Sequence, residues 1–371
     1  MINVLQVGMT RNHGGLETYL LQQWRHLNSS EIHYDFVNIT GEYPIVSENE
    51  IRQSGSEIYS ICSRHISPIK HYYQWFKLLK TYGYKYHAIV LNTNTLEYIF
   101  PLFLAKFFRI PIRVIHSHNA GFGHAIGVKR KLLISLNRIM MKWSATDYFA
   151  CSIKAGQWMF GHNQKFSVIK NAIDIKKIKY NPQKRRELRL KWGLESNFVI
   201  GHIGAFNYQK NHEFLLDIFE KIHQKNFSAI LLLIGGAVDD DSFLKRAQEK
   251  VKIRHLEDVV HFLGVRNDVP DLLQIMDCFV LPSHFEGLPL VGIEAQAAGL
   301  PCFFSDTITQ ELGITKLAHF ISLNESPAKW AEIILNNRKT ERKDMQPEIA
   351  AEGYDVKSEI HKLEKIYQGD K

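Results

Sequence analysis

Two glutamates in the stretch HFEGLPLVGIEAQAAGLP, His284 to Pro301, have residue types and a spacing that suit ligand chemistry. Glu286 lies in a Gly/Pro-rich turn, and Glu294 follows after seven intervening residues, inside a predicted helix. A carboxylate can transfer protons, or it can accept two hydrogen bonds from a vicinal diol. Pro289 suits the start of the helix, where free backbone N–H groups favour an anion.

A carboxylate beside a bound phosphate would repel it, so the two glutamates should face uncharged groups. We expect Glu286 to face a neutral hydroxylated group and Glu294 to face the hydroxyls of a ribose. The alternative for Glu294 is an ion-paired residue on the surface of the helix. The anion would rest on the backbone N–H groups near Gly287–Val291.

Two other segments follow predicted strands, where open α/β sheets bind their ligands. Gly14 and Gly15 would let the backbone approach a ligand, or they form an ordinary turn. They do not form the glycine fingerprint of dinucleotide-binding domains. Lys210 precedes a predicted helix at 212–223, a poor position for a cation unless an anion also binds there. A solvated surface lysine is the alternative.

His116 and His118 in the segment HSHN have the alternation of a strand end, which places both on one side. Three uses remain open for this pair. It could bind a metal, although no carboxylate or cysteine follows at ligand spacing. It could form a hydrogen-bonded turn, or it could donate and accept hydrogen bonds toward a polyol substrate, which is the use that we favour.

The elements that must position these residues are short apolar runs alternating with amphipathic segments of helix length. Runs such as ILLLI and CFVL are apolar at consecutive positions, which is typical of parallel strands buried on both faces. Two series of such runs predict two Rossmann-like, doubly wound α/β domains that face a cleft. The predicted strands are Ile2–Val7, His87–Leu91, Arg113–His116, Tyr148–Cys151, Ser167–Ile169, Phe198–Ile203, Ala229–Ile234, Val259–Leu263, Cys278–Leu281 and Pro301–Phe304.

A polar and basic stretch with Pro182, residues 176–192, separates the two series and predicts the domain boundary. We expect an N-terminal domain at 1–178, a C-terminal domain at 179–350 and a last amphipathic helix within 351–371. The first 180 residues have 22 Lys/Arg against 10 Asp/Glu, whereas the remainder has 24 against 28. The two halves should therefore bind different partners, the basic half binding nucleic acid, a phosphorylated substrate or an anionic membrane.

The 371 residues are 45% hydrophobic and 23% charged, which is typical of globular proteins. The N-terminus reads as a strand and not as a signal peptide, and no apolar run is long enough for a membrane span. Four scattered cysteines without a CxxC pair indicate a reducing compartment and no structural zinc. These features predict a cytoplasmic protein. No recognition helix or aromatic-basic motif supports nucleic-acid binding.

The chain resembles the retaining glycosyltransferases of family 4, a class with the two-domain GT-B fold that often serves polysaccharide biosynthesis. Glu286 and Glu294 match the E-x7-E signature of that family. Supporting matches in the family's order are GGLE at 14–17, HSHN at 116–119, NAID at 171–174, QKNH at 209–212 and FLG at 262–264. The matched segments span nearly the whole chain, and the C-terminal helix is also similar.

The resemblance implies a role for each matched position. The donor sugar would be contacted by His118 and Glu286, and Lys210 would neutralise the diphosphate. Glu294 would bind the ribose. The remaining donor-binding positions would be Gly15 and the backbone at Gly287, Leu288, Leu290 and Val291 beside the diphosphate, with Val265 and Arg266 near the base.

Two positions depart from the family pattern. Ala205 follows Gly204 where the family usually has an arginine that helps to hold the diphosphate, so Arg266 or Arg11 would have to substitute. Ala172 replaces the glycine of the usual NGID, a milder change because alanine tolerates most backbone conformations except a positive φ.

The resemblance implies a hexosyltransferase that uses a nucleotide-diphosphate sugar, with a UDP-sugar as the expected donor, and neither metal nor cofactor. The acceptor would be a hydroxyl of a lipid-linked or polysaccharide glycan for capsule, exopolysaccharide or lipopolysaccharide. Residues 128–143 carry Leu132, Leu136, Ile139, Met140 and Trp143 among five cations. This helix could lie on the inner face of an anionic membrane, or pack in the core with a solvated basic face.

Two other functions fit the same architecture. A nucleotide-sugar 2-epimerase would make a new sugar isomer, and the E-x7-E pattern speaks against it. A non-catalytic scaffold would bind nucleotide sugars without turnover, which Ala205 favours.

Overall fold

A computed structural model of the protein describes residues 1–11, 14–27, 30–41, 44–121, 126–237 and 240–369. These residues form two compact units, which are described separately. Unit 1 comprises Met1–Ala172 together with Val356–Lys371, and unit 2 comprises Ile173–Asp355. The predicted bounds at 178 and 350 both fall inside unit 2. Helix α7 (Ile175–Ile178) explains the first difference, because it packs on helices α12 and α14 of unit 2.

Unit 1 is built on a parallel seven-stranded sheet with the order β3-β2-β1-β4-β5-β6-β7. The central strands are buried over most of their length, which explains why most of their residues are apolar. The strands are β1 (Ile2–Val7), β2 (Ile32–Asn38), β3 (Ile58–Ser60), β4 (Ala88–Thr93), β5 (Ile112–Ser117), β6 (Asp147–Ala150) and β7 (Ser167–Val168).

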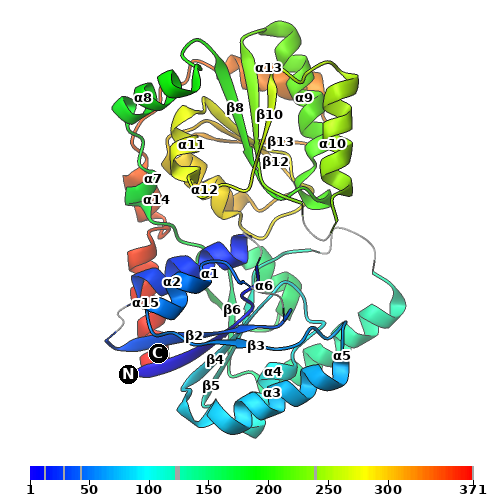
Figure 1. The fold of residues 1–371 in the computed structure, drawn as a ribbon, viewed down its shortest axis with the longest axis vertical. Coiled ribbons are helices and arrows are strands. Elements are labelled where there is room, and N and C mark those ends of the chain that lie inside the picture. The colour runs from blue at the N-terminus through cyan, green and yellow to red at the C-terminus, as the bar shows by residue number, and fades with distance from the viewer. Residues whose placement is uncertain (12–13, 28–29, 42–43, 122–125, 238–239, 370–371) are drawn as a thin grey trace. The chain divides into compact units, whose positions relative to one another are not determined.

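Helices cover both faces of this sheet, with α1 and α2 on one face and α3 and α4 on the other (Figure 1). The last helix of the chain, α15, packs on α1. The helices of unit 1 are α1 (Gly15–His26), α2 (Glu48–Gln53), α3 (Pro68–Tyr82), α4 (Phe100–Phe107), α5 (Val128–Ser144), α6 (Ile153–Phe160) and α15 (Val356–Gln368), with the 3-10 turn η1 (Gly83–Lys85).

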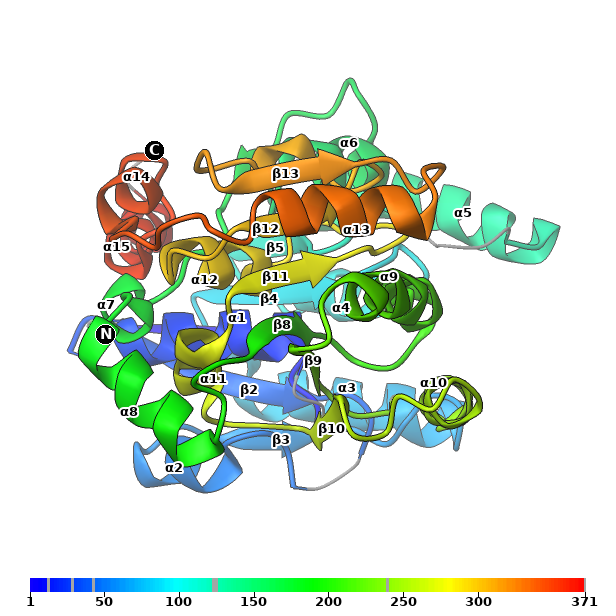
Figure 2. The same cartoon turned by 90° about the horizontal axis from the view of Figure 1, so that it is seen from above.

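Unit 2 repeats the architecture on a six-stranded parallel sheet with the order β10-β9-β8-β11-β12-β13. Figure 2 shows these strands in sequence from one edge of the sheet, β10, to the other, β13. Helices α9 and α13 pack on each other on one face. The strands are β8 (Phe198–Ile203), β9 (Ala229–Ile234), β10 (Val260–Gly264), β11 (Cys278–Leu281), β12 (Cys302–Ser305) and β13 (Ala318–Ile321).

The helical elements of unit 2 surround this sheet. In chain order they are α7, α8 (Pro182–Trp192), η2 (Tyr208–Lys210), α9 (His212–Lys225), α10 (Ser242–Ile253), α11 (Val269–Ile275), α12 (Leu290–Ala297), η3 (Gln310–Leu312), α13 (Pro327–Asn336) and α14 (Gln346–Ala351).

The predicted fold class is confirmed, because both sheets are parallel and all ten predicted strands are present. Strands β2, β3 and β13 were missed. In β2 the apolar pattern is broken by Asp35, which is buried and would be costly there alone. Lys85 and Tyr86 satisfy its carboxylate from 2.9 and 2.7 Å. Together with His33 and a backbone amide, they lower the pKa of Asp35 well below its usual range despite burial.

The domain boundary was predicted near residues 176–192, and the two units divide between Ala172 and Ile173, just before that stretch. Most of the stretch forms α8, which packs on α11 within unit 2. Asp277, just before β11, accounts for this packing. Its carboxylate pairs with Arg189 at 3.1 Å and accepts a hydrogen bond from the backbone N–H of Val199 at 2.7 Å. Arg185 and Arg189 of α8 thus hold the helix on unit 2 through ion pairs with Asp277, which is distant in sequence.

Candidate active site

Two loops of unit 2 meet at the carboxyl ends of the neighbouring strands β8 and β11. Lys210 Nζ lies 2.6 Å from Glu286 Oε1, and Gln209 Nε2 donates to Glu286 Oε2 at 2.8 Å. The backbone N–H of His284 donates to the Gln209 carbonyl at 2.8 Å, and Asn211 Nδ2 donates to the Pro282 carbonyl at 3.2 Å. The Glu286 side chain is only 8% exposed. The two loops therefore form one rigid ionic cluster.

Glycines make room for the lysine of this cluster. A Cβ atom on Gly204 would lie 2.9 Å from Lys210 Cδ, so the lysine stem passes directly over that residue. Gly235, with φ of +147°, abuts the Gly204 carbonyl so closely that a Cβ there would lie 2.0 Å from its oxygen. The side chain of Asn207 accepts the backbone N–H of Lys210 at 3.1 Å. These contacts hold the lysine in place before any ligand binds.

Two buried histidines near Lys210, His202 and His212, are neutral. Burial lowers the pKa of His202 to about 4 and the pKa of His212 well below its ordinary value, and the positive charge of Lys210 adds to both shifts. The His212 ring stacks on Phe206 with centroids 4.0 Å apart. Lys210 therefore carries a positive charge next to two uncharged, closely packed histidines.

Helix α12 begins directly after the Glu286 turn. Pro289 occupies its N-cap, one position earlier than predicted, and Leu290 and Val291 lie in the first turn. Backbone N–H groups of a first turn have no intrahelical acceptor, so they suit an anion. Gly287 and Leu288 lie in the loop just before the cap. The predicted anion-binding positions thus follow Glu286 along one loop and helix end.

Glu294 lies one turn into α12 and differs from Glu286 in its surroundings. Burial alone raises the pKa of Glu294 to about 7, and no cation or hydrogen bond from the described part of the chain offsets the rise. The predicted alternative of an ion-paired surface glutamate is therefore wrong within those residues. A half-buried carboxylate without a protein partner is costly, which is typical of a group that receives a ligand.

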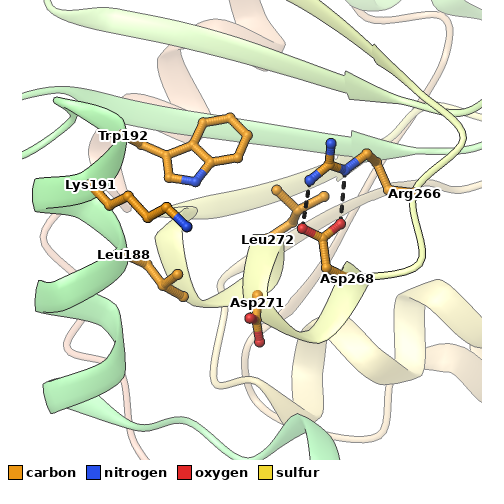
Figure 3. A pocket seen from close by; sticks show the side chains of 7 residues that line it. All are labelled: Leu188, Lys191, Trp192, Arg266, Asp268, Asp271 and Leu272. Carbon is orange, nitrogen blue, oxygen red and sulfur yellow. Dashed lines mark hydrogen bonds and ion pairs between the residues drawn. The ribbon is translucent and has the colours of Figure 1, made fainter.

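Val265 and Arg266 directly follow β10. Val265 is exposed, and the Arg266 guanidinium forms two hydrogen bonds to Asp268, at 2.8 and 2.6 Å. This ion pair borders a pocket of about 510 Å³ that also contacts Lys191 and Trp192 of α8 (Figure 3). None of the pocket residues belongs to the Lys210–Glu286 cluster, and Asp268 already engages the charge proposed to replace an arginine at position 205.

In unit 1, His116 and His118 at the end of β5 lie ring to ring with centroids 4.0 Å apart. Tyr19 of α1 contacts both rings, and its hydroxyl lies 3.3 Å from His116 Nδ1. His118 Nε2 lies 3.0 Å from Asn92 Oδ1. Burial lowers the pKa of His118 to about 3 and that of His116 well below its ordinary value. Both imidazoles are therefore neutral near pH 7.

The glycine pair of unit 1 opens helix α1. Gly14 is the N-cap, and a Cβ on it would lie 2.7 Å from the Glu17 carboxylate. A Cβ on Gly15 would meet nothing within 4 Å, so the fold itself does not require glycine there. Glu17 is buried, which raises its pKa, and Thr10 Oγ1 donates a hydrogen bond to it. A space beside Gly15 is what a close ligand would need.

Three further features of the described residues bear on the sequence predictions. Ala172 has no positive φ, which explains why alanine is accepted in NAID. No group of three or more potential metal ligands occurs in the parts of the chain that the structure describes. Gln209 and Asn92 were not predicted as site residues. The position of Gln209 beside Lys210 could have indicated the first, whereas Asn92 depends on strand pairing.

Helix α5 exposes the apolar residues that a core-packed helix would bury. Leu132, Leu136, Ile139, Met140 and Trp143 are all exposed, from 39% for Met140 to 68% for Ile139. The buried side of α5 is formed instead by Ile134, Met141 and Ser144. The predicted alternative of a core-packed apolar face is therefore wrong for these five residues. No helix in the described ranges is long and apolar enough to cross a membrane.

The comparisons with known proteins agree with the geometry. Residues 184–346 match the family model described as glycosyl transferases group 1. The putative glycosyltransferase EpsF of Bacillus subtilis is 29% identical, over 98% of this chain and 96% of its own length. The chain is a glycosyltransferase, and its residues 184–346 are similar to group 1 of that class. The predicted resemblance to family 4 enzymes is thereby confirmed.

Other relatives of this glycosyltransferase fall in the same class. The capsular polysaccharide biosynthesis glycosyltransferase CapM of Staphylococcus aureus is 27% identical over 68% of each chain. Among solved structures, HepE of Anabaena, in complex with UDP and glucose, has a TM-score of 0.75 at 18% identity, covering 99% of this chain and 95% of its own. That likeness supports the GT-B fold.

Proposed function

We propose that this glycosyltransferase transfers a hexose from a UDP-sugar, with retention of anomeric configuration and without a metal ion, to a hydroxyl of a lipid-linked or polysaccharide acceptor. The observation that carries the proposal is the Lys210–Gln209–Glu286 cluster at the carboxyl ends of β8 and β11, followed directly by α12. The cluster combines a fixed cation, a fixed carboxylate and a helix N-terminus, which together match a sugar diphosphate.

Each part of the donor meets a group of matching chemistry. Lys210 and the first-turn N–H groups of α12 would bind the diphosphate. They would stabilise the negative charge that develops on it as the leaving group. The ribose diol would donate two hydrogen bonds to Glu294, whose carboxylate has no other partner in the described residues. The sugar hydroxyls would meet the remaining acceptor sites of Glu286. Gly15 would lie beside the diphosphate, and Val265 and Arg266 near the base.

The reaction would break the bond between the anomeric carbon and the diphosphate oxygen and form a bond to the acceptor oxygen on the same face. The acceptor's proton would pass to the leaving diphosphate, so no protein nucleophile is needed. In unit 1, the neutral His118 would bind a hydroxyl of the transferred sugar. Relatives support the donor class, since HepE was solved in complex with UDP and glucose, and an Escherichia coli relative, 33% identical over 38% of this chain, is named for UDP-Gal.

The chemistry can be tested with purified protein and a panel of UDP-, GDP- and CMP-sugars. We expect UDP-sugars to raise the melting temperature most, and Glu286→Ala to reduce transfer with donor binding largely kept. Glu332→Ala, an exposed glutamate of α13, is the matched control. Transfer by Glu286→Ala at the parent rate would contradict the assignment. A new sugar isomer would identify an epimerase, and binding without turnover a scaffold.

The enzyme would act at the inner face of a membrane through unit 1. Aromatic contacts connect α5 to α4 and α4 to α3. The ring centroids of Phe103 (α4) and Trp143 (α5) lie 5.2 Å apart, and those of Tyr72 (α3) and Phe100 (α4) lie 4.7 Å apart. Glu97 is the one acidic residue from 58 to 146, against thirteen lysines and arginines. Exposed apolar and aromatic side chains among cations suit an anionic bilayer surface.

Vesicle flotation tests this location. We expect binding to phosphatidylglycerol vesicles that falls steeply with added salt, and loss of most binding in the double variant Leu136→Gln, Ile139→Gln. The matched control changes two apolar residues of unit 2 that are at least as exposed, Phe227→Gln and Ile253→Gln. Equal binding to neutral and anionic vesicles, or equal loss in the control, would overturn the membrane proposal without touching the donor site.

A further inference from the structure

A buried polar network lies beneath His118 in unit 1. Asn92 on β4 and Gln6 on β1 are almost fully buried. The amide nitrogen of Asn92 donates to Gln6 Oε1 at 2.9 Å and to the Val7 carbonyl at 3.2 Å. The amide oxygen of the same residue lies 3.0 Å from His118 Nε2. Buried polar side chains are costly unless they are hydrogen-bonded, and the hydrogen bonds of this network link the sheet to His118.

The network leaves Asn92 only one orientation. Its nitrogen is occupied by two oxygen acceptors, so its oxygen must be the atom that faces the histidine. An amide oxygen accepts hydrogen bonds and cannot donate, so His118 Nε2 must carry a proton. A neutral imidazole has one N–H, and the other nitrogen is then an acceptor. The hydrogen bonds of Asn92 within the sheet therefore fix His118 in the tautomer that is protonated at Nε2.

The second nitrogen of His118 has no protein partner in the described residues. Unlike Nε2 of His116, it is not sealed from solvent. The groups that face the ring are Tyr19 of α1, His116 of β5 and Asn92 of β4. Burial raises the pKa of Tyr19 and lowers that of His116, so neither carries charge near pH 7. Among the described residues, no charged group therefore faces Nδ1, which stays unprotonated near pH 7.

We infer that Asn92 is a positioning residue, which holds His118 in the Nε2–H tautomer so that Nδ1 accepts a hydrogen bond from a hydroxyl of the transferred sugar. Asn92 does not touch the sugar, and Gln6 orients Asn92 in turn. The inference rests on the proposed contact between His118 and the sugar. It adds a direction to that contact, since the sugar hydroxyl must donate and the enzyme must accept.

Replacing Asn92 tests the network kinetically. Asn92→Leu keeps the size of the side chain but removes the acceptor, so we expect kcat to fall about tenfold with KM for the donor within about twofold. Asn94→Leu, an exposed asparagine two residues along, should leave both unchanged. An Asn92→Leu enzyme with parental kcat would overturn the inference.

Asn92→Asp keeps one oxygen that accepts from Nε2, while its second oxygen replaces the amide nitrogen that donates to Gln6 Oε1 and to the Val7 carbonyl. Its charge raises the pKa of His118, so Nδ1 takes up a proton as the pH falls and can no longer accept. We expect kcat near the parent value at pH 9 and a new fall in kcat toward pH 6. Burial keeps His118 of the parent neutral to about pH 3, so that fall should be absent from the parent. Identical pH profiles would contradict the inference.

Histidine-selective ¹⁵N NMR separates this inference from the proposed function. The resonance of His118, assigned by its loss in His118→Gln, should show a protonated Nε2 and an unprotonated Nδ1 in the parent enzyme. The opposite tautomer would overturn the inference whatever the enzyme transfers. If the tautomer is as stated and His118→Gln transfers sugar normally, the proposed role of His118 fails instead.

Discussion

The two candidate regions use the same architecture with opposite electrostatics. In unit 2, Lys210 and Glu286 form a nearly buried ion pair above strand ends. In unit 1, the carboxyl end of β5 carries His116 and His118, which burial keeps neutral. Charged groups suit a diphosphate, whereas neutral donors and acceptors suit sugar hydroxyls. This difference supports the proposal that unit 2 supplies the charged contacts to the diphosphate and that unit 1 adds neutral contacts to the sugar hydroxyls.

Removing the cation should have the largest effect. Lys210→Ala should lower kcat/KM about 100- to 1000-fold, because one charge that stabilises the leaving group is lost and Glu286 is left unpaired. Steady-state kinetics with a UDP-sugar measures the loss, and Lys221→Ala, a lysine of α9, is the control. A fall of less than about fivefold would remove the distinction between the two units.

Glu294 should make donor binding depend on pH. Its carboxyl has a pKa of about 7, so the ionised form that accepts from the ribose is lost as the pH falls through 7. We expect donor affinity to fall about tenfold between pH 8 and pH 6 in the parent, the change in ionised fraction for such a group. In Glu294→Gln the affinity should be lower at pH 8 and nearly constant. A variant that keeps the parent's slope would show that another group titrates.

Gly15 should give the smallest and most diagnostic effect in unit 1. A Cβ there meets none of the described residues within 4 Å, and alanine favours a helix, so Gly15→Ala should raise stability by about 0.5–1 kcal/mol. If the diphosphate lies beside Gly15, the same change should weaken donor binding several-fold. Thermal melting and titration calorimetry measure the two effects. Tighter or unchanged donor binding would remove unit 1 from the diphosphate site.

Much of the fold could be predicted because parallel strands buried on both faces are apolar at every position, as in Ala229–Ile234. Strand β2 could not, since Asp35 is tolerated only through partners that are 50 and 51 residues away. The assignment of α8 to unit 2 could not be predicted for the same reason, because Asp277, the partner of its arginines, is distant in sequence.

The residues of the candidate site also divide into those that the sequence predicts and those that only the structure reveals. Glu286, Glu294 and Lys210 lie in segments whose spacing and turn residues point to ligand binding. Asn92 is an ordinary polar residue at the end of a strand until the pairing of β4 with β1 and β5 places it between Gln6 and His118. Local patterns therefore predicted the residues expected to touch the ligand, whereas the residues that orient them needed the structure.

Calorimetric titration of UDP into three proteins tests the central claim most directly. UDP contains the diphosphate but no sugar to transfer, so it isolates the ionic cluster from the histidines. The account predicts that Lys210→Ala weakens UDP binding at least tenfold, whereas His118→Ala binds UDP like the parent. Parental UDP affinity in Lys210→Ala, or an equal loss in both variants, would contradict it.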